Sequence, residues 1–443
     1  MTGVLIADEQ GLGKTVQALA VCEAAGLFPA VVICPTSVRV NWSREINKWL
    51  PHRSTKILYG RGRSNPLPKV DVLIVGWDTL HSWADKLPTP KALIIDEAHL
   101  AKNGLAHRTK AVVRLADRCH DNNDVVIALT GTPILNRVNE LVSLLRIINR
   151  LDEFGGPSKF RNEYSELARL PILNHALRRS CFVRRKKIDV LKELPPKRYV
   201  NVSLEPDEKL MVKYREAERH VIGYLARTAE QAAIDSGATT DEARAQAVKT
   251  ALRAVAGEQL VAINSLRRLA VQAKLASVDQ WFDSFMESGE KVVVFAWHRE
   301  IVEHLADKYS NGLKIYGGMT DQEKQQAIDN FQNHAQYKVL VCSIKAAGVG
   351  ITLTAASNVV FIEQGWTPAD QDQATDRCHR IGQTDSVTAW TLNAAGTIDD
   401  DISELIHQKR LVVNAGTDGD LVANENSESV LTDLVIRLAS KPS

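Results

Sequence analysis

A glycine-rich segment near the N-terminus carries residue types that bind a triphosphate. The apolar run Val4–Ala7 leads into eight residues, Asp8, Glu9, Gln10, Gly11, Leu12, Gly13, Lys14 and Thr15, and a helical pattern follows. Glycines let the backbone wrap around phosphate, and amides at a helix N-terminus point at the anion. Lys14 would reach the β- and γ-phosphates, and Thr15 would ligate magnesium. We expect these eight residues to bind ATP with Mg²⁺, although Asp8 replaces the first glycine of the generic pattern; a plain turn is the competing interpretation.

Two further motifs follow later apolar runs. Asp96 and Glu97 come directly after the run Ala92–Ile95. An Asp at a strand end can hold magnesium through water, and the neighbouring Glu can polarise the attacking water. Taken alone, such a pair is as often a helix N-cap. Thr130 and Thr132 flank a glycine after the next run and could sense the γ-phosphate, although the segment could also be a simple turn.

A third constellation lies late in the chain. Thr367 is a good N-cap and Pro368 a good first residue for a helix over Ala369–Arg380, with Gly382 ending it. The spacing puts three side chains on one face of this helix: Gln373, Arg377 and Arg380. Two guanidinium groups on one face suit a phosphoryl group in its transition state. A solvated basic face, with Asp side chains nearby, explains the spacing equally well.

The apolar runs that must position these residues form two sets. The first comprises Val4–Ala7, Val31–Cys34, Val72–Val75, Ala92–Ile95 and Val125–Leu129, and the second Val292–Ala296, Leu313–Tyr316, Val339–Cys342, Val359–Ile362 and Thr388–Leu392. The runs are continuous, which is typical of strands buried on both faces in a parallel sheet covered by helices. The fold class is therefore α/β, with two parallel-sheet lobes, and ligands are expected at the carboxyl ends of the strands.

Changes in composition and in the pattern of apolar runs divide the chain into four parts: lobe one over 1–175, a linker and helical insertion over 176–275, lobe two over 276–413, and a tail over 414–443. The pair Pro195 and Pro196 suits a linker. Within the insertion, a break at Ser236–Gly237 precedes Thr240, a plausible N-cap. We expect the first part of the tail to be mobile, followed by a short amphipathic pattern around Val430–Leu438.

Composition bounds the class of protein. The 443 residues are 44% hydrophobic and 24% charged, an ordinary globular balance, and no uncharged apolar stretch is long enough to span a membrane. The N-terminus lacks the pattern of a signal peptide. Six scattered cysteines suggest reduced thiols and no zinc site. These features favour a cytoplasmic protein, or a nuclear one in a eukaryote, and we expect a monomer.

The segment from Arg178 to Arg198 is strongly basic. It holds nine Lys or Arg residues against Asp189 and Glu193, whereas the net charge of the whole chain is only +2. Such an excess predicts a salt-sensitive stripe that binds DNA phosphates. Competing interpretations are a solvated charged helix, a pairing of Arg184 within the cleft, and a nuclear localisation signal. No array of aromatic residues suggests a stacking platform, which favours duplex over single-stranded DNA.

The motifs occur in an order that resembles one family. Asp8–Thr15, Asp96–His99, Leu129–Pro133 and Arg377–Gln383 are similar to the Swi/Snf-type DNA translocases of helicase superfamily two, over residues 1 to about 413. Three further segments look like the same family: Cys34–Ser37 with Trp42, Gly348–Thr352 and Trp366–Pro368. Phe295–His298 and Val183–Leu191 are most similar to the annealing-helicase (HepA-related) branch.

The resemblance implies two RecA-like lobes that hydrolyse ATP in the cleft between them and track along duplex or forked DNA. It implies catalysis by Lys14, Thr15, Asp96, Glu97, Arg377 and Arg380, and nucleotide binding by the glycine-rich loop, Gly350 and Gln373. It places further residues in segments that touch DNA or couple it to ATP: Thr36, Ser37, Thr130, Thr132, Ser343, Trp366, Arg184 and Arg185. Relatives carry an adenine-reading segment before the phosphate loop, whereas this chain begins with Met1, Thr2 and Gly3. We therefore expect the segment to be missing, through a truncated gene product, a wrongly assigned start or loss in this lineage, which puts adenine recognition in question.

Three functions remain open on the sequence. The first is a DNA-stimulated ATPase and translocase that remodels forks or anneals strands in DNA repair. The second is a strand-separating helicase or the motor of a restriction system, which would need a wedge or nuclease motif that we do not find. The third is a nucleotide-dependent DNA-binding protein with weak or no turnover.

Overall fold

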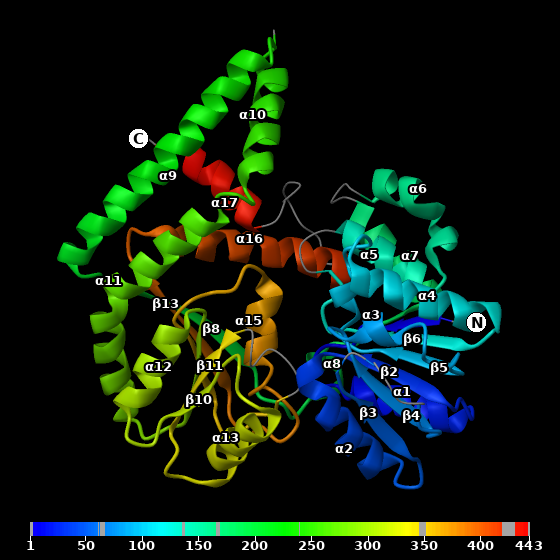
Figure 1. Cartoon of the computed structure of the whole chain (residues 1–443). Coiled ribbons are helices and arrows are strands. Elements are labelled where there is room, and N and C mark those ends of the chain that lie inside the picture. Colours follow the sequence, from blue (N-terminus) through cyan, green and yellow to red (C-terminus); the bar gives the residue numbers. More distant parts are fainter. Residues whose placement is uncertain are drawn as a thin grey trace. The chain divides into compact units, whose positions relative to one another are not determined.

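The computed structural model describes residues 3–60, 62, 67–134, 138–164, 169–238, 240–344, 351–418 and 430–441 (Figure 1). The chain forms two compact units. Unit 1 comprises Met1–Leu194 and Leu411–Asn426, and unit 2 comprises Pro195–Arg410 and Ser427–Ser443. The first boundary falls immediately before the two prolines Pro195 and Pro196, where a linker was expected.

Unit 1 is built on a seven-stranded sheet in the order β3-β4-β2-β5-β6-β1-β7, and all its strand pairs are parallel. The strands are β1 (Gly3–Ile6), β2 (Ala30–Cys34), β3 (Thr55–Leu58), β4 (Val72–Gly76), β5 (Ala92–Ile95), β6 (Val125–Leu129) and β7 (Phe182–Val183). The five strands predicted in this part of the chain are confirmed. The two edge strands, β3 and β7, were not predicted, because neither is a long continuous apolar run.

Helices flank the sheet of unit 1: α1 (Lys14–Ala24), α2 (Arg39–Trp49), α3 (Leu80–Trp83), α4 (His107–Asp121), α5 (Leu141–Ile147), α6 (Gly156–Glu163), α7 (Leu170–Ser180) and α8 (Lys187–Val190). The longest, α4, shows how they pack: it buries Ala111, Val112, Leu115 and Cys119 against the sheet and exposes its charged face. Short 3₁₀ helices follow two strands, η1 (Thr36–Val38) after β2 and η2 (Ala98–Ala101) after β5.

Unit 2 has a six-stranded parallel sheet in the order β10-β11-β9-β12-β13-β8. Its strands are β8 (Lys197–Leu204), β9 (Val292–Ala296), β10 (Leu313–Ile315), β11 (Val339–Ser343), β12 (Asn358–Phe361) and β13 (Val387–Ala394). Five of them were predicted. The edge strand β8 was assigned instead to the linker, although Val200, Val202 and Leu204 alternate with polar residues at the spacing typical of a strand.

The helices of unit 2 are α9 (Glu208–Asp235), α10 (Asp241–Val255), α11 (Leu260–Met286), α12 (Arg299–Lys308), α13 (Asp321–Asn333), α15 (Pro368–Thr375), α16 (Ile398–Asp418) and α17 (Val430–Ala439). Figure 1 shows α9 and α10 extending away from the second sheet, as expected for an insertion. The predicted break between them is confirmed, and the Thr240 hydroxyl caps α10 by accepting from the amide of Ala243 at 3.3 Å.

The C-terminal tail differs from the expectation at its start. Residues 414–418 complete α16, whose last part, from Leu411, belongs to unit 1 while its first part belongs to unit 2. The amphipathic pattern expected around Val430–Leu438 is confirmed as α17. The segment 419–429, expected to be mobile, lies outside the described residues. Among the helices that the structure describes, none has the length and apolarity to cross a membrane.

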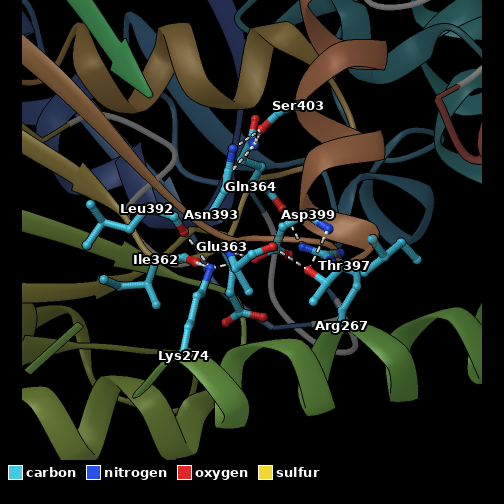
Figure 2. A network of polar contacts seen from close by, with 12 residues as sticks. Arg267, Lys274, Ile362, Glu363, Gln364, Leu392, Asn393, Thr397, Asp399 and Ser403 are labelled. Atoms are coloured by element: carbon cyan, nitrogen blue, oxygen red, sulfur yellow. Dashed lines mark hydrogen bonds and ion pairs between the residues drawn. The ribbon is translucent and has the colours of Figure 1, made fainter. Parts of the chain in front are cut away.

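Two buried cations attach α11 to the carboxyl edge of the second sheet (Figure 2). The ammonium group of Lys274 donates to the carbonyls of Ile362 and Leu392 at 2.6 and 2.5 Å, and to the Asp399 carboxylate at 2.6 Å. About two turns earlier on the same helix, Arg267 donates to the carbonyl of Gln364. These contacts join α11 to the segments that follow β12 and β13, and thereby fix the chain that leads into α15.

We expect Lys274→Ala to destabilise this edge of unit 2 strongly, because the substitution leaves Asp399 buried without its cation. Loss of one partner of a buried ion pair costs about 3–5 kcal/mol. Hydrogen exchange of the β12 and β13 amides in the full chain measures the effect as a fall in their opening free energy. The matched control is Arg268→Ala on the same helix, whose partner Glu300 is at the surface. Equal protection in the two variants would contradict the prediction.

Candidate nucleotide site

The predicted phosphate loop lies at the carboxyl end of β1 and begins α1. Gly11 and Gly13 adopt φ values of 89° and 75°, which side chains with a Cβ rarely adopt. Gly13 is the N-cap of α1, and no side chain caps the helix. The first amides of α1 therefore remain available for an anion, which is the property expected of a phosphate loop.

Lys14 is anchored to the loop that precedes it. Its ammonium group donates to the carbonyls of Asp8 at 2.7 Å and Glu9 at 3.3 Å. Burial lowers the pKa of Lys14 to about 8, while the nearby carboxylates of Glu97 and Asp96 act in the opposite direction. An anionic phosphate beside Lys14 would favour its charged form further, since an opposite charge stabilises the ammonium ion.

Asp96 is oriented by two tryptophans. The indole N–H of Trp42 donates to its carboxylate at 2.8 Å, and the indole N–H of Trp77 donates to its carbonyl at 2.9 Å. Burial raises the pKa of Asp96 to about 7, and the Glu97 carboxylate adds to this, whereas the Trp42 hydrogen bond and the Lys14 charge lower it. Asp96 therefore needs these two partners, or a cation, to remain ionised near neutral pH.

Glu97 stands in a conformation that few residues adopt. Its φ is 48°, in the left-handed region, and its side chain is 11% exposed. Its carboxylate lies 3.3 Å from the ring of His99, whose Nδ1 lies 3.0 Å from the Thr130 hydroxyl. Backbone strain of this kind persists where the surroundings hold a residue in a fixed place, and it clusters at functional sites. The carboxylate of Glu97 is thus held at the edge shared by β5 and β6.

The loop after β6 connects this acidic pair to the phosphate loop. Thr130 is buried, and its hydroxyl accepts from the amide of Thr132 at 3.1 Å while it contacts His99. Between the two threonines, a Cβ on Gly131 would lie only 2.5 Å from the side chain of Gln10. Glycine is therefore required where this loop packs against the phosphate loop. The arrangement suits a sensor that responds to the γ-phosphate.

The remaining predicted residues of unit 1 have different surroundings. Thr36 donates to the carboxylate of Asp78 at 2.9 Å, and Ser37 beside it is exposed. Arg184 donates to the carbonyls of Ala7 and Gly131, which leaves its side chain 8% exposed. Arg185 forms an ion pair with Asp8, a residue predicted to bind ATP. Both arginines, expected in a DNA-coupling segment, are thus bonded to the phosphate loop and its neighbour.

In unit 2 the helix predicted over Ala369–Arg380 is shorter than expected. Thr367 caps it in a capping box with Asp370, as predicted, but α15 ends at Thr375. The carbonyl of Arg377, which would continue the helical ladder, accepts instead from the amide of Leu353 at 2.8 Å. The prediction that Gln373, Arg377 and Arg380 share one helical face is therefore wrong, since the two arginines lie in the turn after the helix.

The other predicted site residues of unit 2 have the following surroundings. Gln373 is half-buried on α15, Arg377 is buried, and Arg380 donates to the hydroxyl of Thr352 at 3.1 Å. Ser343 ends β11 and is half-buried. The guanidinium carbon of Arg267 lies over the ring of Trp366, 4.7 Å from the ring centre. Gly350 and Gly348 lie outside the described residues.

The residues of unit 1 fit a magnesium nucleoside triphosphate. Uncapped helix amides and Lys14 suit the phosphate oxygens, while Thr15 and Asp96 suit a cation held mainly by phosphate and water. In the part of the chain that the structure describes, no group of three or more His, Cys, Asp or Glu could hold a metal ion by itself. When bound, Mg²⁺ neutralises charge on the phosphates.

Comparison with known proteins agrees with these features. The SNF2-related domain matches residues 1–261, and the helicase conserved C-terminal domain matches residues 273–382. The chain belongs to the SNF2 family. It is 30% identical over 449 residues to the SWI/SNF-related matrix-associated actin-dependent regulator of chromatin subfamily A-like protein 1 of Xenopus tropicalis, covering 96% of this chain and 44% of that protein.

Two further similarities are a curated protein and a solved structure. The DNA annealing helicase and endonuclease ZRANB3 of Mus musculus is 29% identical, over 94% of this chain and 39% of that protein. The SWI2/SNF2 ATPase core of Sulfolobus solfataricus, solved with double-stranded DNA, is 26% identical with a TM-score of 0.41, over 95% of this chain and 89% of that one. The chain spans less than half the length of the Xenopus and mouse relatives.

Several residues that shape the site were not predicted to do so. Trp42 was noted only as part of a family segment, while Trp77 and Gln17 were not singled out. Gln17 donates to the Asp8 carboxylate and to the carbonyl of Leu12, both at 2.9 Å. Its place one turn into α1 could have suggested a contact with the loop. No pattern in the sequence pairs either tryptophan with Asp96, because these contacts join α2 and the residue after β4 to the end of β5.

We expect Trp42→Phe to move the acidic limb of the pH profile of ATP hydrolysis to higher pH. The Trp42 hydrogen bond lowers the pKa of Asp96, so its loss raises that pKa, and the carboxylate ionises only at higher pH. A shift of up to about one pH unit in kcat/KM is expected. Trp49→Phe, an exposed change on the same helix, is the control. Superimposable acidic limbs in the two variants would contradict this role for Trp42.

Proposed function

We propose that this SNF2-family chain is an ATP-dependent DNA translocase. The observation that carries the proposal is the placement of Lys14, Asp96 and Glu97 at the carboxyl ends of strands of one parallel sheet, with the pKa of Lys14 influenced by both carboxylates. A phosphate loop opposite a strained glutamate is suited to hydrolysis rather than to nucleotide binding alone. Family membership supports the same activity.

The individual roles follow from this chemistry. Lys14 and Thr15 would bind the phosphates and Mg²⁺, Asp96 would hold the cation through water, and Glu97 would orient the attacking water. Arg377 and Arg380 would neutralise charge in the transition state, with Gln373 and Gly350 beside the nucleotide. These roles fall in lobe one (1–175) and lobe two (276–413); the segment 176–275 between them adds β7 and β8 to the two sheets and contains the helical insertion.

Duplex or forked DNA is the proposed track. The mouse relative is named as a DNA annealing helicase, which favours strand annealing or fork remodelling in DNA repair as the task. The basic segment Arg178–Arg198 supports a DNA contact, but only some of its residues remain available. Arg179, Lys192 and Arg198 are exposed, whereas Arg184 and Lys197 form ion pairs and are mostly buried; Arg185 is half exposed, but its guanidinium is paired with Asp8.

ATP turnover measured with and without duplex DNA tests the proposal. The wild-type chain should hydrolyse ATP faster when duplex DNA is added, and Lys14→Ala should abolish the stimulated rate, because the phosphates lose their ammonium partner. Lys110→Ala, an exposed change on α4, should leave the rate unchanged. Nucleotide-dependent DNA binding without any turnover would overturn the proposal in favour of a binding protein. Displacement of a labelled strand would favour a strand-separating helicase.

The exposed basic residues Arg179 and Lys192 should contribute to the salt dependence of DNA affinity. Replacing Arg179 and Lys192 by Ala removes two positive charges and should reduce the slope of log affinity against log salt by about two. Fluorescence anisotropy of a labelled duplex over a range of salt concentrations measures the slope. Arg146→Ala with Lys110→Ala, two exposed changes outside the segment, is the control pair. An unchanged slope would place the DNA elsewhere on the protein.

A further inference from the structure

The phosphate loop of this chain contains a buried carboxylate where the generic pattern has a glycine. Asp8 is fully buried at the end of β1. A negative charge at this place opposes the binding of a triphosphate unless it is neutralised. The loop therefore needs a cation of its own, separate from Lys14, whose ammonium group must serve the phosphates.

Arg185 supplies that cation. Its backbone amide donates to the Asp8 carboxylate at 2.9 Å, and its guanidinium donates to both carboxylate oxygens, with Nε at 3.1 and 3.0 Å. Gln17 of α1 completes the set of donors at 2.9 Å. Burial by itself raises the pKa of Asp8, but the hydrogen bonds of Arg185 and Gln17 hold it below its ordinary value.

The main chain around Arg185 runs alongside the entrance to the loop. Beyond the β1–β7 ladder, the amide of Ala7 donates to the carbonyl of Val183 at 2.7 Å, and the amide of Glu9 donates to the carbonyl of Arg185 at 3.0 Å. The amide of Lys187 then donates to the Glu9 carboxylate at 2.7 Å. Residues 7 to 9 are thus fixed from one side by a segment far away in the sequence.

This contact determines where Lys14 is anchored. The carbonyls that hold its ammonium group belong to Asp8 and Glu9, the two residues that the Arg185 segment fixes. Arg184 extends the same bracing, because its guanidinium joins the carbonyl of Ala7 at 2.8 Å to that of Gly131 at 3.1 Å. Displacing Arg185 would release the backbone that presents Lys14 to the phosphates.

We propose that Arg185 is a positioning residue of the phosphate loop, which acts through Asp8 on nucleotide binding, and that it is not a DNA contact. The inference rests on the proposed ATPase function. It also divides the basic segment Arg178–Arg198 by role: Arg184 and the half-exposed Arg185 serve the nucleotide because they are bonded beside the phosphate loop, and the exposed residues Arg179 and Lys192 serve DNA.

Two equilibrium measurements on the full chain separate these roles. Affinity for a non-hydrolysable ATP analogue with Mg²⁺ is measured by calorimetry, and affinity for a labelled duplex is measured without nucleotide. Arg185→Gln should weaken nucleotide binding about tenfold or more, since it removes a charge-assisted contact and leaves a buried anion uncompensated. Its DNA affinity should stay within about twofold of wild type. Arg179→Gln removes the same charge from the same segment. It should weaken DNA binding and leave nucleotide affinity unchanged.

A double variant keeps the test decisive if Arg185→Gln folds poorly. Asp8→Asn combined with Arg185→Gln removes the buried charge and retains groups that can hydrogen-bond, so it should recover part of the lost nucleotide affinity. A purely additive double variant, or Arg185→Gln with normal nucleotide affinity, would overturn the inference, as would a selective loss of DNA affinity in Arg185→Gln. If the wild-type chain itself fails to bind the analogue, the proposed function falls, which is a distinguishable result.

Discussion

The site depends on holding one ammonium group near two carboxylates at the edge of a parallel sheet. Lys14 follows β1, and Asp96 and Glu97 follow β5, with β6 lying between the two strands. Because all three strands are parallel, their carboxyl ends meet at one edge, and the helix that begins at Lys14 adds its free amides there. Burial weakens the charged form of both Lys14 and Asp96, so each relies on the other and on a phosphate or cation to remain charged.

That electrostatic balance is maintained by residues that do no chemistry. Trp42 and Trp77 orient Asp96, while Thr130 joins His99 to the loop that packs on Gln10. On the other side, β7 and the residues after it brace the phosphate loop. The phosphate loop is therefore fixed from two sides within unit 1, which leaves little freedom for its backbone when a nucleotide binds. Such preorganisation favours binding, because less ordering is needed at that moment.

Unit 2 uses buried charge in a different way. Lys274 and Arg267 project from α11 into the ends of β12 and β13, where they bond to backbone carbonyls and to Asp399 (Figure 2). The long helix of the insertion is thereby attached to the segment that carries Trp366 and leads into α15. The attachment gives a physical connection between the insertion and the arginine-bearing turn, since a shift of α11 would disturb both strand ends.

The sequence by itself determined ten of the described strands, the two-sheet α/β class, the phosphate loop and the cap of α15, because each depends on local spacing of apolar, glycine and capping residues. It did not determine the end of α15, the edge strands β3, β7 and β8, or the partners of Arg184 and Arg185. Those outcomes depend on contacts between distant segments. The amide of Leu353 donates to the carbonyl of Arg377, and the guanidinium of Arg185 donates to the Asp8 carboxylate. Charge counted along the chain suggested a DNA stripe, whereas only the tertiary structure showed which of its cations already had a carboxylate.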